Sequence, residues 1–194
     1  MASDVNPPST PTHGHVPVLL DACVEHLAPA PHDVVVDLTV GRGGHAAALG
    51  RHLSSDGTLV LCDLDRANLT YATDRVKAET AARVLPFHCS FARIPRELLD
   101  LNLHATCVLG DLGFASNQMD AAERGFSIMR DGPLDMRLDA SSGRTVAAFL
   151  ASVSEDDLAF IIQNRLIRCR WDTLGRVRDQ ARRRRSADNP RPER

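Results

Sequence analysis

Residues 34–49 read VVVDLTVGRGGHAAAL, and this stretch decides the fold. The three valines are β-branched and suit a strand that is buried on both faces, as in a parallel sheet. Gly41, Gly43 and Gly44 allow a tight turn in which a ligand can approach the backbone closely. The alanine-rich segment that follows is a good helix start, and the first turn of a helix offers unpaired N–H groups to anionic groups. A strand, a glycine-rich turn and a helix in this order predict a nucleotide-binding unit.

A second predicted strand, residues 58–62, leads into the acidic sequence Asp63-Leu64-Asp65. A carboxylate about 20 residues after the glycine turn is placed to bind the hydroxyl groups of a ribose, which makes Asp63 a candidate. Asp65 is better explained as the N-cap of the next helix. The glycines are spaced G-x-G-G, so the G-x-G-x-x-G pattern of dinucleotide-binding proteins is not met. These features indicate an adenosine-type cofactor and disfavour an NAD-dependent oxidoreductase.

The alternation of strands and helices continues to about residue 111. Helices are expected at residues 22–27, 46–53, 66–82 and 97–101, and further strands at residues 83–89 and 106–111. Pro86 cannot donate a backbone hydrogen bond and therefore indicates an edge strand or an irregularity. Strands and helices that alternate at this spacing predict an α/β fold with a parallel sheet.

Composition narrows the classes of protein that remain. At 194 residues, with 43% hydrophobic residues, the chain is long enough for one domain with a buried core. Its 5 cysteines follow neither a disulfide framework nor a zinc-binding spacing, and no metal site is expected. No apolar run is long enough to cross a membrane and the N-terminus does not resemble a signal peptide, so a soluble, cytoplasmic protein without a membrane partner is expected.

Charge is distributed unevenly along the chain. Residues 165–194 hold 11 arginines and 4 acidic residues, whereas the rest of the chain holds 12 basic and 21 acidic residues. We expect an acidic folded body followed by a basic tail that is disordered, or that binds RNA without sequence preference. The first 12 residues are rich in Pro, Ser and Thr and are also expected to be disordered.

The segment from Leu112 to Arg144 is rich in Gly, Asp and Arg and shows no clear hydrophobic period. A loop of this length within a compact domain is usually functional. Two helices are expected after it, at residues 145–150 and 154–162, and Ser154 is the expected N-cap of the second.

Several motifs, in this order, resemble the bacterial 16S rRNA cytosine-N4 methyltransferases of the MraW/RsmH type. The resemblance covers about residues 13–162. The motifs that carry it are HVPVLLD at 15–21, VGRGGH at 40–45, DLD at 63–65, DLGFASNQ at 111–118, AERGFS at 122–127 and DGPLDMR at 131–137. No single motif is specific, but the combination is.

The resemblance implies a class I S-adenosylmethionine-dependent methyltransferase with a Rossmann-like parallel sheet and an inserted helical subdomain. It also implies a substrate, a cytosine in the decoding region of 16S rRNA, and hence the small ribosomal subunit as partner. By motif, Gly43, Gly44 and His45 would line the methionine part of the cofactor, and Asp63 would bind its ribose. Phe91 would pack by the adenine, and Asp111 and Gln118 would lie at the cofactor and catalytic face.

Asp111 is the candidate catalytic residue, because ligands bind at the carboxyl ends of strands in such sheets. Phe114 stands where amino-methyltransferases with an Asp-Pro-Pro-Tyr motif carry an aromatic residue, so it would either stack on a splayed-out base or pack in the core. Arg124, Arg130 and Arg137 have two interpretations as well. They would contact rRNA phosphates, or they would pair with acidic residues of the same loop, namely Asp131, Asp135 and Asp139.

Two departures from the family pattern are visible. The motif at residues 111–118 has Phe-Ala-Ser-Asn after its glycine, where Val-Ser-Ser-Pro is commoner, but Asp111 and Gln118 are retained. The likeness stops after Ile162, so we expect a shortened or frame-shifted copy that holds the first four strands. The expected organisation is a cofactor-binding region at 13–118, a partial insertion subdomain at 119–162 and a basic tail at 163–194.

Overall fold

The computed structural model of the protein describes residues 17–165. The predictions for the N-terminal 12 residues and for the chain beyond residue 165 lie outside this range. The described chain forms two compact units that divide after Ala147. The predicted domain boundaries at residues 118 and 162 stay predictions.

The first unit is built on a four-stranded parallel sheet, as the sequence predicts. The strand order is β3-β2-β1-β4. The strands are β1 (Val34–Asp37), β2 (Thr58–Asp63), β3 (Arg83–His88) and β4 (Cys107–Leu109). Pro86 lies in β3, which among the described residues pairs only with β2 and is therefore an edge strand, one of the two possibilities that this proline indicates. This arrangement confirms the α/β, Rossmann-like fold class.

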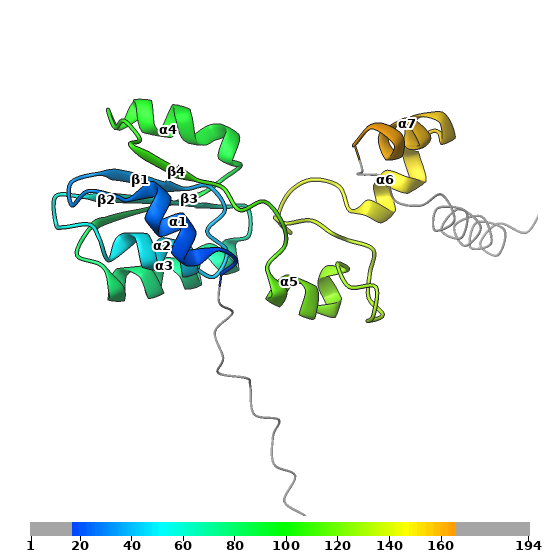
Figure 1. Ribbon diagram of the computed structural model, residues 1–194. Helices are drawn as coiled ribbons and strands as arrows, with labels where there is room; N and C mark the ends of the chain where they lie inside the picture. Colours follow the sequence, from blue (N-terminus) through cyan, green and yellow to red (C-terminus); the bar gives the residue numbers. More distant parts are fainter. Residues whose placement is uncertain (1–16, 166–194) are drawn as a thin grey trace, which may run out of the picture. The chain divides into compact units, whose positions relative to one another are not determined.

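Helices cover both faces of the sheet (Figure 1). They are α1 (Leu20–Leu27), α2 (Gly44–Gly50), α3 (Arg66–Glu79) and α4 (Ile94–Asp100). The first three lie on one face and α4 lies on the other. The predicted ends of α2 and α3, at residues 53 and 82, were wrong by a turn or less. Gly50 closes α2, and the extended Thr80 follows α3 and donates its hydroxyl to the Gly50 carbonyl.

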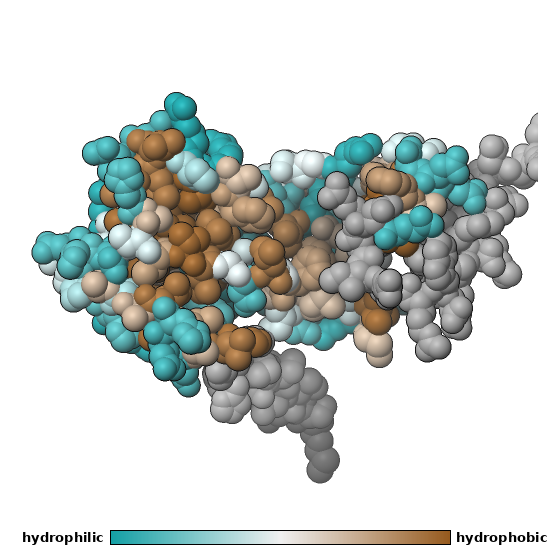
Figure 2. Space-filling model, turned by 45° about the horizontal axis from the view of Figure 1, so that its top comes forward, coloured by the Kyte–Doolittle hydropathy of each residue, from teal (hydrophilic) through white to brown (hydrophobic). Residues whose placement is uncertain are grey.

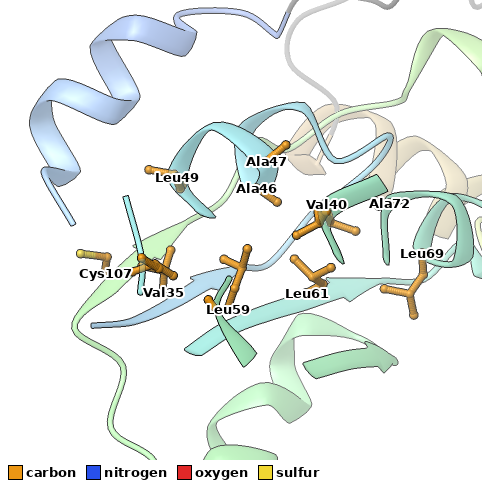
Figure 3. Packing of buried hydrophobic residues seen from close by; sticks show 13 residues of the cluster. Val35, Val40, Ala46, Ala47, Leu49, Leu59, Leu61, Leu69, Ala72 and Cys107 are labelled. Atoms are coloured by element: carbon orange, nitrogen blue, oxygen red, sulfur yellow. The ribbon is translucent and has the colours of Figure 1, made fainter. Parts of the chain in front are cut away.

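Two apolar clusters flank the sheet because alternate strand residues point to opposite faces. Val35, Leu59 and Leu61 face α2 and α3 and pack with residues such as Leu49 and Ala72 (Figure 3). On the other face, Val36, Val60 and Cys62 pack against α4 through Ile94 and Leu98. The core therefore fixes the strand ends, and with them the edge of the sheet at which ligands bind in such folds.

The chain after β4 is partly helical, where the sequence predicts a long segment without clear period. It contains α5 (Ser116–Asp120) and a short 3-10 turn, η2 (Ala122–Arg124). Backbone hydrogen bonds close the rest of the segment on itself, for example from Met136 N to Arg124 O at 3.0 Å. The predicted helices after this segment are present as α6 (Val146–Ser152) and α7 (Glu155–Arg165). Ser154 caps α7 as predicted, since its hydroxyl accepts the Asp157 N–H.

Strand β4 runs only from Cys107 to Leu109 and is shorter than the predicted range of 106–111. Within residues 17–165, β4 pairs with β1 and with no other strand. Val108 is exposed on β4, and Leu112 and Phe114 are exposed directly after it. Figure 2 shows hydrophobic residues reaching the surface of the sheet-containing unit. No helix among the described residues is long and apolar enough to cross a membrane.

Candidate functional site

An open cleft of about 920 Å³ lies at the carboxyl ends of the strands. Its wall is formed by the residues directly after β1, the glycine turn, the end of β2, one side of α3 and the segment from Asp111 to Gln118. Six of the seven predicted site residues line it, namely Gly44, His45, Asp63, Phe91, Asp111 and Gln118. Gly43 is not among the lining residues.

Asp63 ties the glycine turn to the end of β2. Its Oδ2 accepts the Gly41 N–H at 2.8 Å and its Oδ1 accepts the Asp65 N–H at 2.8 Å. Gly41 has a φ of 50°, which places its N–H toward the carboxylate at little cost for glycine. Burial raises the pKa of Asp63. Each carboxylate oxygen has a second lone pair, so the side chain can still accept hydrogen bonds from a ligand.

Three carboxylates from three neighbouring strand ends share this region. Asp37 ends β1 and is fully buried, and its Oδ1 accepts the Thr39 N–H at 3.1 Å. Burial raises the pKa of Asp37 to about 7, and the charges of Asp63 and Asp111 add to that rise. Near neutral pH, Asp37 can therefore hold a proton that an ordinary aspartate would have lost.

Gly43 and Gly44 act through packing. Gly43 has a φ of 75°, and a Cβ at this position would lie 3.1 Å from the Ala72 Cβ of α3. A Cβ at Gly44 would overlap the Pro17 ring. These glycines allow α3 and the start of the described chain to approach the turn. The packing of Gly43 and Gly44 does not test their predicted contact with the cofactor, which stays a proposal.

His45 lies in the first turn of α2 and is buried. Its Nε2 is 3.0 Å from the Val18 carbonyl oxygen, which requires a proton on Nε2 because a carbonyl only accepts. The side chain thus joins α2 to the segment that precedes α1, and it also lines the cleft.

Asp65 is the N-cap of α3, as predicted, and it does more than cap. Its Oδ1 accepts the N–H groups of Ala67 and Asn68. Its Oδ2 accepts Gln118 Nε2 at 2.9 Å and Arg124 Nη1 at 2.8 Å. Burial raises the pKa of Asp65, but these hydrogen bonds and the Arg124 charge outweigh burial, so the net pKa is lowered.

Gln118 is 3% exposed and has both ends of its amide engaged. Its Oε1 accepts the Ala115 N–H at 2.9 Å while its Nε2 donates to Asp65. Gln118 therefore holds the segment after β4 against the start of α3. Gln118 is one of the residues that line the cleft, as predicted. Its direct contact with a cofactor stays a proposal.

Aromatic side chains line the cleft on two sides. Phe91 opens the 3-10 turn η1 (Phe91–Arg93) after β3 and is 45% exposed. Phe114 is 55% exposed and packs against the buried Phe126, with ring centroids 4.7 Å apart. Asp111 lies between the strand end and Phe114, and its backbone N–H donates to Thr39 Oγ1 at 2.7 Å. The exposed carboxylate and the exposed ring therefore share one short segment of the cleft wall.

Arg124, Arg130 and Arg137, for which the sequence left contact with rRNA phosphates and pairing with acidic residues open, all form ion pairs within the protein. Arg137 makes a two-pronged ion pair with Asp135, as one of the interpretations predicts. Arg130 pairs with Asp120, and Arg124 pairs with Asp65. Contact with rRNA phosphates stays a prediction for these residues.

Sequence reasoning missed several polar groups of the cleft. Asn68 of α3 lines the cleft wall and accepts Asn117 Nδ2 on its Oδ1 at 2.9 Å. Its own Nδ2 is buried without a hydrogen-bond partner among the described residues. Tyr71 and Arg75 follow Asn68 on the same side of α3, at helical spacing. That spacing was the available signal, but it became informative only once α3 was placed beside the glycine turn.

No group of three or more His, Cys, Asp and Glu side chains in residues 17–165 is arranged to hold a metal ion. The cleft itself offers carboxylates, aromatic rings and the unpaired Asn68 amide.

The model of the MraW methylase family matches residues 12–166. The chain belongs to the MraW methylase family. Enzymes of this family are S-adenosylmethionine-dependent methyltransferases, which confirms the predicted family and cofactor class.

Curated relatives of this MraW family chain are named ribosomal RNA small subunit methyltransferase H. The relative from Alteromonas mediterranea is 41% identical over 151 residues, which are 77% of this chain and 47% of the relative. The relative from Cupriavidus necator is 41% identical over 162 residues, which are 84% of this chain and 47% of the relative. The relative from Idiomarina loihiensis is 40% identical over 155 residues. The chain therefore spans about half the length of the curated relatives that it matches.

Proposed function

We propose that this chain binds S-adenosylmethionine in the cleft and takes part in methylation of small-subunit ribosomal RNA. The finer proposal is transfer of the methyl group to N4 of a cytosine in the decoding region of 16S rRNA, in the cytoplasm. The observation that carries the proposal is the cleft, which brings six predicted site residues together at the carboxyl ends of the strands in a chain of the MraW family.

The residues present fit the cofactor. Asp63 is held by two backbone N–H groups and keeps free lone pairs for ribose hydroxyls. Phe91 offers an apolar wall for the adenine. The buried, unpaired Asn68 Nδ2 is a donor for a ligand oxygen, and a bound acceptor would relieve the cost of leaving it unsatisfied. In this proposal Gly43, Gly44, His45 and Gln118 complete the cofactor-binding residues.

S-adenosylmethionine supplies an electrophilic methyl group on a sulfonium sulfur. Transfer to an amine is an in-line displacement, so the protein mainly aligns the two reacting groups. The lone pair of a cytosine N4 is delocalised into the ring, and the exposed Asp111 carboxylate can accept a hydrogen bond from the amine as its charge develops. Phe114, three residues further on, can stack on the base.

A titration of the purified chain with S-adenosylmethionine tests the binding part. We expect saturable binding, and at least a tenfold weaker affinity for Asp63→Asn, because an amide NH₂ would replace an acceptor that faces an N–H group. Asp56→Asn is the matched control, since Asp56 is exposed in the turn before β2 and does not line the cleft. Circular dichroism of each variant verifies that it is folded.

A methyl-transfer assay on immature small ribosomal subunits tests the catalytic part. The alternative function is binding without turnover. Two observations on the described residues favour this alternative. Strand β4 pairs only with β1, and the apolar residues Val108 on β4 and Leu112 and Phe114 after it are exposed. Cofactor and RNA binding without methyl transfer would support that alternative. A folded chain that binds no cofactor would refute the proposed function, and one that binds neither cofactor nor RNA would refute the alternative as well.

A further inference from the structure

A pair of side chains at the rim of the cleft is not used by the proposed chemistry. The Arg42 guanidinium carbon lies 3.4 Å from the centroid of the Tyr71 ring. Arg42 belongs to the glycine turn and Tyr71 to α3, and both line the cleft. Arg42 is exposed and Tyr71 is 45% exposed. We call these two residues the rim pair.

The rim pair is held in place by the residues around it. Arg42 stands between Gly41 and Gly43, which both have positive φ. Arg75 Nη1 donates to the Arg42 carbonyl oxygen at 3.2 Å. The backbone that carries the Arg42 side chain is therefore fixed from α3, and the ring beneath the guanidinium belongs to the same helix. A site that is held in this way loses little conformational entropy when it binds a ligand.

Charge distinguishes Arg42 from the other guanidinium group in the cleft wall. Arg75 Nε is 3.1 Å from Glu79 Oε1, so Arg75 is ion-paired, with a carboxylate that it shares with Arg51. Among the residues that the structure describes, Arg42 has no carboxylate within ion-pair distance. A guanidinium that stacks on a ring keeps its N–H edges free to bind an anion. Arg42 is thus an uncompensated cation at the rim of a cleft that is also lined by the carboxylates of Asp63 and Asp111.

We propose that the rim pair binds the RNA strand whose base enters the cleft, with Arg42 on a phosphate and Tyr71 against a base. This inference rests on the proposed function and names a surface for it. A polyanion is repelled by the Asp63 and Asp111 carboxylates of the cleft and is attracted most where an uncompensated cation stands at the rim. Adjacent aromatic and cationic side chains bind single-stranded nucleic acid by stacking and by phosphate contact together.

Substitutions separate RNA binding from cofactor binding. The probes are an in vitro transcript of small-subunit rRNA in a filter-binding titration and S-adenosylmethionine in a calorimetric titration, both with the full chain. We expect Arg42→Ala to weaken RNA binding about fivefold or more and to reduce the slope of log K against log salt by about 0.7–0.9. We expect Tyr71→Ala to weaken it about fivefold, and Tyr71→Phe to retain the affinity, because stacking needs the ring and not the hydroxyl.

The matched control is Arg83→Ala. Arg83 is an exposed arginine at the start of β3. Its substitution removes the same charge at the amino ends of the strands, whereas the cleft lies at their carboxyl ends. Equal RNA affinities for Arg42→Ala and Arg83→Ala would overturn the inference. So would a loss of cofactor affinity in Arg42→Ala with RNA binding unchanged, since Arg42 would then bind the cofactor carboxylate.

The two proposals fail in different ways. A chain that binds S-adenosylmethionine but no RNA overturns the rim-pair inference and leaves the cofactor site standing. A chain in which the rim-pair variants lose RNA affinity, but which transfers no methyl group to small subunits, upholds the inference and refutes the proposed catalysis.

Discussion

The Arg124 guanidinium donates to the Asp65 carboxylate at 2.8 Å, although the two residues are 59 positions apart in the sequence. The same guanidinium donates through Nη2 to the carbonyl oxygens of Arg137 and Leu138. Arg124 therefore joins three segments, namely the start of α3, the 3-10 turn η2 and the chain near residue 138. This ion pair, in which Asp65 is buried and Arg124 partly buried, fixes the segment after β4 beside the end of β2 that carries Asp63.

Arg124→Ala should destabilise the fold strongly. The change leaves Asp65 buried without its counter-charge and two carbonyl groups without a donor, so we expect a loss of about 2–4 kcal/mol in the free energy of unfolding. Urea denaturation measures it. Arg130→Ala is the control, because its pair with Asp120 is exposed on both sides and should contribute less than about 1 kcal/mol.

The effect of Arg124→Ala should also depend on pH. The net pKa of Asp65 is lowered in the folded protein. A carboxylate of this kind contributes stability above its ordinary pKa of about 4, and that contribution is lost as the pH falls through the lowered value. The difference between wild type and variant should therefore shrink on acidification to about pH 3. A difference that stays constant with pH would show that Arg124 stabilises the fold through its carbonyl contacts alone.

Asp37→Asn should stabilise the protein at alkaline pH. Burial raises the pKa of Asp37 to about 7, so the folded state binds this proton more tightly than the unfolded chain does. The resulting stability is full below the unfolded pKa of about 4 and is lost as the pH rises through about 7. Asparagine carries no charge and keeps the acceptor for the Thr39 N–H.

Urea unfolding at about pH 5 and about pH 8 measures the effect. From about pH 5 to about pH 8, the free energy of unfolding of the variant should rise relative to that of wild type by a few kcal/mol, because one pKa unit corresponds to about 1.4 kcal/mol. Asp56→Asn, at an exposed turn, should show no such gain. If wild type and Asp37→Asn kept a constant difference, Asp37 would titrate as an ordinary aspartate.

The alternation of strands and helices along the chain, and the approximate position of each helix, follow from local patterns. Buried valine runs, Gly and Pro positions and alternation at a regular spacing predicted a parallel sheet, and Pro86 indicated an edge strand or an irregularity, of which the first is observed. The N-cap role of Asp65 was also predictable, because an Asp directly before a helical pattern is a local signal. Family motifs located the strand ends, so six cleft residues could be named before the structure was known.

The contacts across the cleft were not predictable in the same way. Nothing in the sequence near Arg124 indicates Asp65 as its partner, and acidic residues of its own loop were the expected partners. The stacking of Arg42 on Tyr71 depends on the approach of α3 to the glycine turn, which Gly43 permits by lacking a Cβ. Such contacts depend on tertiary packing, and a single sequence contains no periodicity that reports them.

Gly43→Ala should destabilise the turn. The φ of 75° is costly for alanine, and the new Cβ would stand 3.1 Å from the Ala72 Cβ. We expect a loss of about 1–3 kcal/mol from backbone strain and overpacking together. Gly113→Ala is the control, because a Cβ there meets nothing within 4 Å. Thermal unfolding of the two variants measures this loss of stability. Similar unfolding midpoints would show that α3 shifts to accommodate the extra methyl group.

Phe114→Ala should separate substrate alignment from stability. The ring is 55% exposed and contacts Phe126 with centroids 4.7 Å apart, so its loss should cost only about 0.5–1.5 kcal/mol in unfolding free energy. If the exposed part of the ring stacks on the target base, methyl transfer should fall at least tenfold while S-adenosylmethionine binding is retained, because alignment governs this displacement. Phe114→Tyr keeps the ring and should keep most of the rate. A Phe114→Ala variant with unchanged methyl transfer would assign the ring to packing on Phe126 alone.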